Sequence, residues 1–308
     1  MTAARARRVA GNAHSVTGST RNWVDGTRRV TDGKRSVVGS RRALCGLVLL
    51  VLLFSLAFVG PLLSPWGWDE TDFAAFRQGP SDQHWFGTTQ SGRDVFALTL
   101  HGTQKSLFIG LCVAVVSTGL AAVVGTVAGF VGGWLDRVLM WGVDLLLVLP
   151  SFLVLAVLLP RLGESWLMLV PLLAAFLWMV TARVVRAMTI SLREREYILA
   201  ARFLGVGAPR VIVRHVLPQL ASLLVVDASL NVSVAIIAES GLAYLGFGVR
   251  PPDVSLGTVI ADGRSTATTY PWSFGFAAGL LVLIVLAVNL LGDGLRDVLD
   301  PEFGGEWR

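Results

Sequence analysis

Long apolar runs and short polar segments alternate along most of this chain. Because a helix needs about 20 apolar residues to cross the ~30 Å hydrocarbon core of a bilayer, runs of that length predict transmembrane helices. The pattern predicts six of them, at residues 44–63, 106–131, 138–159, 166–185, 220–245 and 274–291. The composition agrees, since 54% of the 308 residues are hydrophobic and the mean hydropathy is +0.65. The sequence therefore predicts an all-α integral membrane protein with six transmembrane helices.

The positions of the basic residues predict how these helices are oriented. Lys and Arg near the ends of membrane helices favour the cytoplasmic side. With a cytoplasmic N-terminus, 20 of the 26 Lys and Arg residues fall in inner segments and 6 in outer segments. The charge pattern therefore predicts that both termini lie in the cytoplasm. It also places the loop at 183–217, which holds seven arginines, on the cytoplasmic side.

The chain divides into five parts, of which the first is strongly basic. This first part holds ten basic and two acidic residues, and we expect it to be disordered and to lie against anionic membrane lipid. It accounts for the net charge of +5, which therefore gives no reason to expect nucleic acid as a partner. The predicted parts are a tail at 1–43, a first transmembrane helix at 44–63, an extracytoplasmic loop at 64–105, a core of five transmembrane helices at 106–295 that includes a cytoplasmic loop at 186–218, and a cytoplasmic tail at 296–308.

The cytoplasmic loop has the pattern of a helical hairpin. At 192–204 apolar residues recur among arginines, which is typical of a helix at a membrane surface. Gly205 and Gly207 permit a turn, and Pro209 suits the first turn of a second short helix that runs toward Pro218. Taken alone, the pattern also fits an amphipathic helix that only lies along the membrane surface.

The spacing of small residues in this loop resembles a known coupling element. Ala200-Ala201 is followed after three residues by Gly205, and after nine more by His215-Val216-Leu217-Pro218. This spacing resembles the coupling loop of ABC importer permeases, through which an ATPase subunit drives the membrane domain.

Further motifs, in one order, resemble the second permease subunit of dipeptide and oligopeptide importers. They extend over roughly residues 85 to 302, and on them the chain is identified as a member of that family. The motifs are Phe86-Gly87-Thr88, Gly92-Arg93-Asp94, Gly132-Gly133-Trp134-Leu135-Asp136, Asp144, Pro150, Glu239, Leu245-Gly246-Phe247-Gly248, Pro251-Pro252, Asn289-Leu290-Leu291-Gly292-Asp293-Gly294-Leu295-Arg296-Asp297 and Leu299-Asp300-Pro301.

The resemblance implies the type I ABC importer (MetI-like) permease fold in a bacterial cytoplasmic membrane. It implies a homologous second permease, two cytoplasmic ABC ATPase subunits or domains, and an extracytoplasmic peptide-binding protein as partners. The chain lacks the G-x-x-x-x-G-K-[ST] phosphate loop, so we expect no cofactor in this chain and expect ATP and Mg²⁺ on the partner ATPases. The residues that the resemblance assigns to ATPase coupling are Glu196, Leu199, Ala200, Ala201, Arg202, Gly205, Gly207, His215 and Pro218.

Three positions depart from the family pattern. Thr89 stands where the outer motif usually has Asp, and Gln219 replaces an Asn after Leu-Pro. Leu199 stands where the family usually has Glu before the Ala-Ala pair. Glu196 lies three residues earlier on nearly the same helical face and offers a replacement carboxylate. The alternative is a more apolar contact with the ATPase.

Acidic residues inside the predicted spans form a second candidate site. Ionisable groups at that depth are costly, so they normally face the interior of a bundle or a water-filled path. Asp227 and Asn231 share a helical face, and with Glu239 and Asp144 they predict a polar strip along a substrate path. The alternative is a structural role, in which each acid has a partner at a helix or subunit contact. For Asp144 that partner is Arg137 or the second permease.

Other reactive side chains give weaker signals. His14, His84, His101 and His215 have no metal-ligand spacing, and Cys45 and Cys112 lie in different predicted spans, so we expect neither a metal site nor a disulfide. Three carboxylates of the outer loop are expected to be solvated, with the last paired to Arg93 or another loop residue; they are Asp72, Asp82 and Asp94.

The resemblance implies a transporter of di- and oligopeptides. An enzyme is not expected, because no catalytic set converges in the spans. Two other functions remain open. One is import of nickel or another small solute, and the other is a membrane scaffold or sensor that has lost coupling, for which Leu199 is the only hint.

Overall fold

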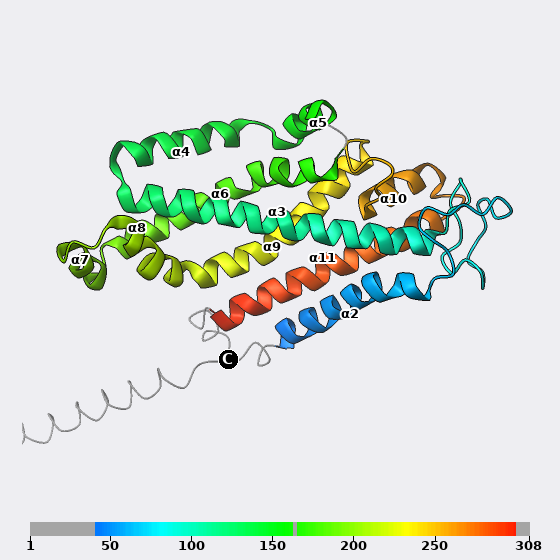
Figure 1. Cartoon of the computed structure of the whole chain (residues 1–308), viewed down its shortest axis with the longest axis horizontal. Helices are drawn as coiled ribbons and strands as arrows, with labels where there is room; N and C mark the ends of the chain where they lie inside the picture. The colour runs from blue at the N-terminus through cyan, green and yellow to red at the C-terminus, as the bar shows by residue number, and fades with distance from the viewer. Residues whose placement is uncertain (1–40, 163–164, 300–308) are drawn as a thin grey trace, which may run out of the picture.

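The structure is a computed structural model that describes residues 41–162 and 165–299. The expected disorder of the N-terminal tail and most of the expected C-terminal tail therefore lie outside the described residues. The described residues form helices joined by turns and irregular segments, and their only β-type pairing is one isolated bridge between Thr88 and Asp94. Its helices lie side by side as an elongated bundle (Figure 1). The main helices are α2 (Arg41–Leu63), α3 (Val95–Val131), α4 (Gly133–Val148), α5 (Ser151–Leu162), α6 (Leu169–Arg193), α7 (Glu196–Phe203), α8 (Ala208–Val211), α9 (Leu217–Tyr244), α10 (Leu256–Gly263) and α11 (Trp272–Leu299).

Five of the predicted spans are continuous helical segments, and the all-helical prediction is confirmed. The third span is different, because the single helix expected at 138–159 is wrong. The chain bends there by 86° between α4 and α5. Pro150 explains the break: the residue before a proline is pushed out of helical geometry, and Leu149 is extended at φ −72°, ψ 131°. The described residues therefore contain five candidate membrane spans, or six if α4 and α5 together form one bent span.

The second span also differs from the prediction, because α3 begins at Val95 and not at 106. The side chain of Asp94 accepts a hydrogen bond from the Ala97 backbone and caps the helix at this earlier position. Polar residues in the first turns of α3, such as His101 and Lys105, lower the local hydropathy, so the apolar pattern placed the start of the helix too late. At 37 residues, α3 is about 56 Å long and runs through the whole bundle.

Close backbone contacts join α3 to α6. A Cβ added at Gly125 would lie 2.6 Å from the carbonyl oxygen of Ala182, and one added at Gly129 would lie 2.7 Å from that of Arg186. These two glycines are one helical turn apart. Small residues at this spacing let membrane helices approach closely, which is what stabilises helix packing where no hydrophobic effect operates. The contact between α3 and α6 is the most extensive in the molecule.

The two ends of the described chain lie at the same end of the bundle. Helix α2 packs along α11 (Figure 1), and Arg42 lies 3.7 Å from Asp297. The backbone of Ala43 lies so close to Gly294 that no side chain fits there. The α7–α8 hairpin lies at this end of the bundle too, whereas α10 lies at the opposite end. This arrangement agrees with the prediction that both termini and the loop at 186–218 share one side of the membrane.

The glycine contacts predict a difference between two glycines of α3. Replacement of Gly129 by Ala should lower the apparent Tm of the purified protein, because the new Cβ collides with the backbone of α6. Replacement of Gly119 by Ala is the matched control, since nothing lies within 4 Å of its Cβ position. We expect this control to be neutral or stabilising, because Ala favours a helix over Gly by about 1 kcal/mol. Equal Tm values for the two variants would contradict the packing argument.

Candidate functional site

The cytoplasmic loop forms the helical hairpin that its sequence predicts. Helix α7 ends in a motif in which the Val206 N–H donates to the Ala201 carbonyl and the Gly205 N–H donates to the Arg202 carbonyl. This pair of bonds requires a left-handed residue after the helix, and Gly205 has φ +80°. Gly207 has an ordinary φ of −63° and begins α8. Of the two glycines, only Gly205 is therefore required by backbone geometry.

The second half of the hairpin leads back into the bundle. Pro209 lies in the first turn of α8, as predicted, and Pro218 lies in the first turn of α9. A proline within a continuous helical segment removes one N–H and crowds the carbonyl four residues earlier. The five residues before Leu217 are wound as a wider π-helix, which gives the chain room at this point. His215 lies in this π-helix, with its ring 6.3 Å from that of Tyr197.

The inner face of the hairpin is anchored in the protein. Ile198 is fully buried, and it belongs to a cluster with Phe130 of α3, Val185 of α6 and Val211 of α8. The guanidinium of Arg202 lies 5.6 Å from the centre of the Phe130 ring, which adds a cation–π contact. The hairpin is therefore packed against the ends of α3 and α6.

The outer face of the hairpin presents apolar side chains to solvent. Phe203 is 90% exposed and Leu204 is 84% exposed, beside partly exposed Tyr197 and Leu199. Glu196 opens α7 and is exposed, and no described residue forms an ion pair with it. Of the nine predicted coupling residues, Ala201 and His215 are half-buried, and the exposed ones are Glu196, Leu199, Ala200, Arg202, Gly205, Gly207 and Pro218.

Asp227 joins three helices inside the bundle. Its carboxylate accepts hydrogen bonds from Thr118 of α3 at 3.1 Å, from Thr181 of α6 at 2.7 Å, and from Asn231 at 2.9 Å. The predicted pairing of Asp227 with Asn231 on one helical face is therefore present. The sequence did not identify the two threonines, because ordinary threonines in apolar runs give no signal of their own.

Glu239 is fully buried near the outer end of α9 and is separate from Asp227. One of its carboxylate oxygens accepts a hydrogen bond of 2.6 Å from Ser255, the residue that caps α10. The two acids are twelve residues apart on the helix, or about 18 Å. The structure therefore places Glu239 at the junction of α9 and α10, in a contact within this subunit.

Asp144 lies on a different surface from the other acids. Its expected pairing with Arg137 is wrong, since its carboxylate accepts a hydrogen bond from Arg183 of α6. One helical turn on, Arg186 donates to both oxygens of Asp136, with Nη2 2.6 Å from Oδ2. Arg137 instead donates to the backbone of its own helix. Two Arg–Asp pairs thus hold α4 against α6.

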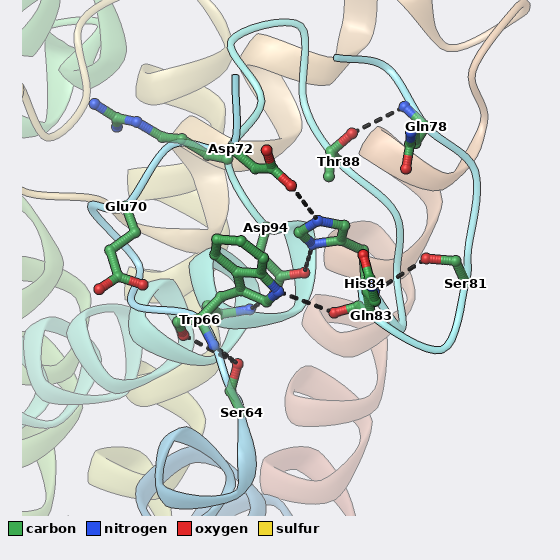
Figure 2. A network of polar contacts seen from close by, with 12 residues as sticks. Ser64, Trp66, Glu70, Asp72, Gln78, Ser81, Gln83, His84, Thr88 and Asp94 are labelled. Atoms are coloured by element: carbon green, nitrogen blue, oxygen red, sulfur yellow. Dashed lines mark hydrogen bonds and ion pairs between the residues drawn. The ribbon is translucent and has the colours of Figure 1, made fainter. Parts of the chain in front are cut away.

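The outer motif at 86–94 builds a buried polar network that the sequence prediction missed (Figure 2). His84 is 1% exposed, and its Nδ1 lies 2.9 Å from Asp94 while its Nε2 lies 3.5 Å from Asp72. The Trp66 ring stacks on the imidazole. The expectation that Asp72 is solvated is therefore wrong, because it faces the buried His84. The expected pairing of Asp94 with Arg93 or another loop residue is confirmed in its second form, since the partner is His84. The sequence feature that could have indicated this network is the Gly-Arg-Asp motif, whose last residue, Asp94, caps α3.

Comparison with known proteins identifies the family. A family model for a binding-protein-dependent transport system inner membrane component matches residues 121–305, which is more than half of the chain. A second model, for the N-terminal TM domain of oligopeptide transport permease C, matches residues 35–80. The chain belongs to this family of transport permeases.

Curated relatives of the permease carry related names. The oligopeptide transport system permease protein OppC of Mycobacterium tuberculosis is 57% identical over 257 residues, which are 83% of this chain and 88% of that protein. A putative peptide permease protein of Brucella suis is 42% identical over 83% of this chain and 85% of its own length. The OppC of Bacillus subtilis is 35% identical over 83% of this chain and 84% of its own length.

Family membership confirms several predictions from the sequence. The permease is a multi-pass protein of the bacterial inner membrane, and it is a component of a transport system that includes a binding protein. The family is one of permeases and not of enzymes.

The position of Asp227 predicts how its variants behave. Asn in its place keeps one acceptor oxygen for Thr118 and Asn231, and its amide NH2 can donate to the Thr181 hydroxyl, which can also accept. Asp227→Asn should therefore keep both the Tm of the assembled transporter and its uptake rate. Asp227→Ala removes all acceptors and should cost about 1–3 kcal/mol of stability, because it leaves buried donors without a partner. Thermal unfolding and uptake measured on the same samples check this. Loss of uptake in Asp227→Asn at an unchanged Tm would instead assign the carboxylate to the substrate path.

Proposed function

We propose that this permease is one half of the membrane domain of an ATP-driven importer of di- and oligopeptides. The observation that carries the proposal is the match to both family models, together with the printed names of relatives that are up to 57% identical. The second half is a homologous permease. Two cytoplasmic ABC ATPase subunits or domains bind ATP and Mg²⁺, and an extracytoplasmic binding protein delivers the peptide.

The ATPase contact in this proposal is the exposed face of α7. Its apolar tip, Phe203 and Leu204, is suited to insert into a groove on a partner protein. Glu196 has no ion pair among the described residues, so its carboxylate can bind a basic group of the ATPase. Leu199 is exposed on the same helix, so an apolar contact at that position is equally accessible. The buried contacts of Ile198 then transmit a movement of the hairpin to α3 and α6. Rigid-body rocking of the two permeases opens the path alternately to each side.

The second permease and the peptide path belong, in this proposal, on the α4–α6 surface. The side chains of Asp144 and Arg183 are 57% and 50% exposed in the single chain. Both lie within spans, where hydrocarbon is a costly environment for ionised groups. Water or protein therefore covers this surface in the assembled transporter, and not lipid. At the outer end, the segments 64–94 and 248–271 receive the binding protein.

The hairpin geometry predicts that Gly205 is needed for coupling. Gly205→Val forces a β-branched residue into φ +80° and should distort the end of α7, so that transport falls while ATP hydrolysis by the complex continues. Gly207→Ala is the matched control, because Gly207 has an ordinary φ and open space around it. Uptake and ATPase rates of the reconstituted complex are compared. Normal uptake per ATP in Gly205→Val would rule out this lever role.

The substrate class is tested on the complete transporter in liposomes. The chain is co-expressed with the second permease, the ATPases and the binding protein encoded beside it. ATP hydrolysis should rise several-fold when the binding protein and short peptides are added together. Nickel ions with the same binding protein serve as the control and should have no effect. Stimulation by nickel, and none by any peptide, would contradict peptide import.

A further inference from the structure

A hollow with opposite charges lies at the outer end of the permease, between α3, α10 and the start of α11. It consists of two adjoining cavities of about 540 Å³ and about 310 Å³. Both cavities are lined by Arg93, Val254 and Asp262. Sites for small ligands are typically about 300–1,000 Å³ in volume, with a few convergent polar groups on an apolar wall. The larger cavity alone is in that range.

Five charged groups line the two cavities; Arg250, Asp253 and Arg264 have partners within the protein, whereas Arg93 and Asp262 are available to a ligand. No described residue forms a hydrogen bond or an ion pair within 4 Å with the carboxylate of Asp262 or the guanidinium of Arg93. Asp262 is exposed and Arg93 is half-buried in the single chain, so a ligand in the hollow can reach both groups. By contrast, Asp253 at the edge of the smaller cavity is already paired with Lys105 at 2.9 Å.

The backbone holds Arg93 in a fixed position beside the hollow. Its N–H donates to the side chain of Thr89, and its carbonyl accepts from the Thr89 N–H. The preceding residue, Gly92, has φ +76°, and a Cβ there would lie 2.3 Å from the backbone of Asp72. The following residue, Asp94, caps α3 and faces His84. The Gly-Arg-Asp motif thus fixes the backbone of an arginine whose guanidinium forms no hydrogen bond or ion pair with the described residues.

The rest of the wall suits a peptide of variable sequence. Its apolar part consists of Leu98, Val254 and Val259, which accept side chains without directional bonds. Hydroxyl and amide groups provide partners for a peptide backbone; they belong to Thr89, Gln90, Ser91, Thr266 and Ser273. A ligand with only a negative charge would leave Asp262 unmatched. A metal ion is disfavoured, because Asp262 lies near Arg93 and the second carboxylate of the hollow, Asp253, is already paired with Lys105.

We propose that this hollow is a receiving site for short peptides with free ends, in which Asp262 binds the terminal ammonium group and Arg93 binds the terminal carboxylate. The site accepts the peptide at the outer mouth before it enters the membrane path. This inference rests on the proposed function of peptide import, and it adds a subsite on this subunit.

Transport kinetics with blocked peptides test the site. The full complex with its binding protein is reconstituted, and uptake of one tripeptide is measured in its free, N-acetylated and C-amidated forms. Asp262→Asn should raise the KM for the free peptide about tenfold, with a much smaller effect on the N-acetylated form, because a charge-assisted hydrogen bond is lost only in the former. Arg93→Gln should show the converse pattern, with the smaller effect on the C-amidated form. The apparent kcat should change less than the KM in both variants.

A matched control removes an arginine charge elsewhere on the outer side. Arg161 is an exposed arginine at the end of α5, and it does not line the hollow. Arg161→Gln should leave the KM values of all three peptides as in the wild type. Peptide affinity of the isolated binding protein, measured separately, sets the baseline for the blocked forms.

The outcomes separate this site from the function on which it rests. If the wild-type complex imports no peptide in any form, the proposed function fails. If the wild type imports peptides but Asp262→Asn and Arg93→Gln change the KM equally for free and blocked forms, only the receiving site is overturned. Loss of the second permease or of bound binding protein from both variant complexes during purification would also overturn it, by assigning the hollow to a protein contact.

Discussion

The hydrocarbon of the bilayer offers no hydrogen bonds, and this constraint accounts for most of the structure. Every polar group at membrane depth must find its partner inside the protein. Asp227 accepts three hydrogen bonds from three helices, and Glu239 accepts one from the residue that caps α10. Because helices in lipid gain little from burying apolar surface, they associate through close contacts such as Gly129 against the backbone of α6.

The parts of the fold that could be predicted from the sequence are those set by local pattern. Apolar length fixes which segments span the membrane, and the arginine count fixes their orientation, so these predictions needed no tertiary information. The break in the third span and the early start of α3 were missed. Pro150 was a local signal for the break, because the residue before a proline tends to leave helical geometry. Asp94 was a local signal for the start of α3, because a carboxylate can cap a helix. Average hydropathy over long windows conceals such signals.

The partners of the candidate site residues were harder to predict, since they depend on which helices are neighbours. Asp144 pairs with Arg183, thirty-nine positions along the chain, and not with the nearby Arg137. The burial of His84 between two aspartates likewise depends on how the outer loop folds back on itself. The hairpin at 196–218 was predictable in more detail, because Gly205, Pro209 and Pro218 each restrict the local backbone geometry.

Helix α3 connects the two functional ends of the permease. Its cap, Asp94, follows directly after Arg93 at the outer hollow, and its last turns hold Phe130 in the cluster beneath the cytoplasmic hairpin. Over its length it packs against α2, α6, α9 and α10. A continuous helix of about 56 Å transmits displacement with little internal bending. A push on the hairpin by an ATPase is therefore expected to tilt α3 as a whole and to shift the outer hollow in the same movement. In this proposal, one rigid element of this chain couples the outer and cytoplasmic sites, and no chain of side-chain rearrangements is required between them.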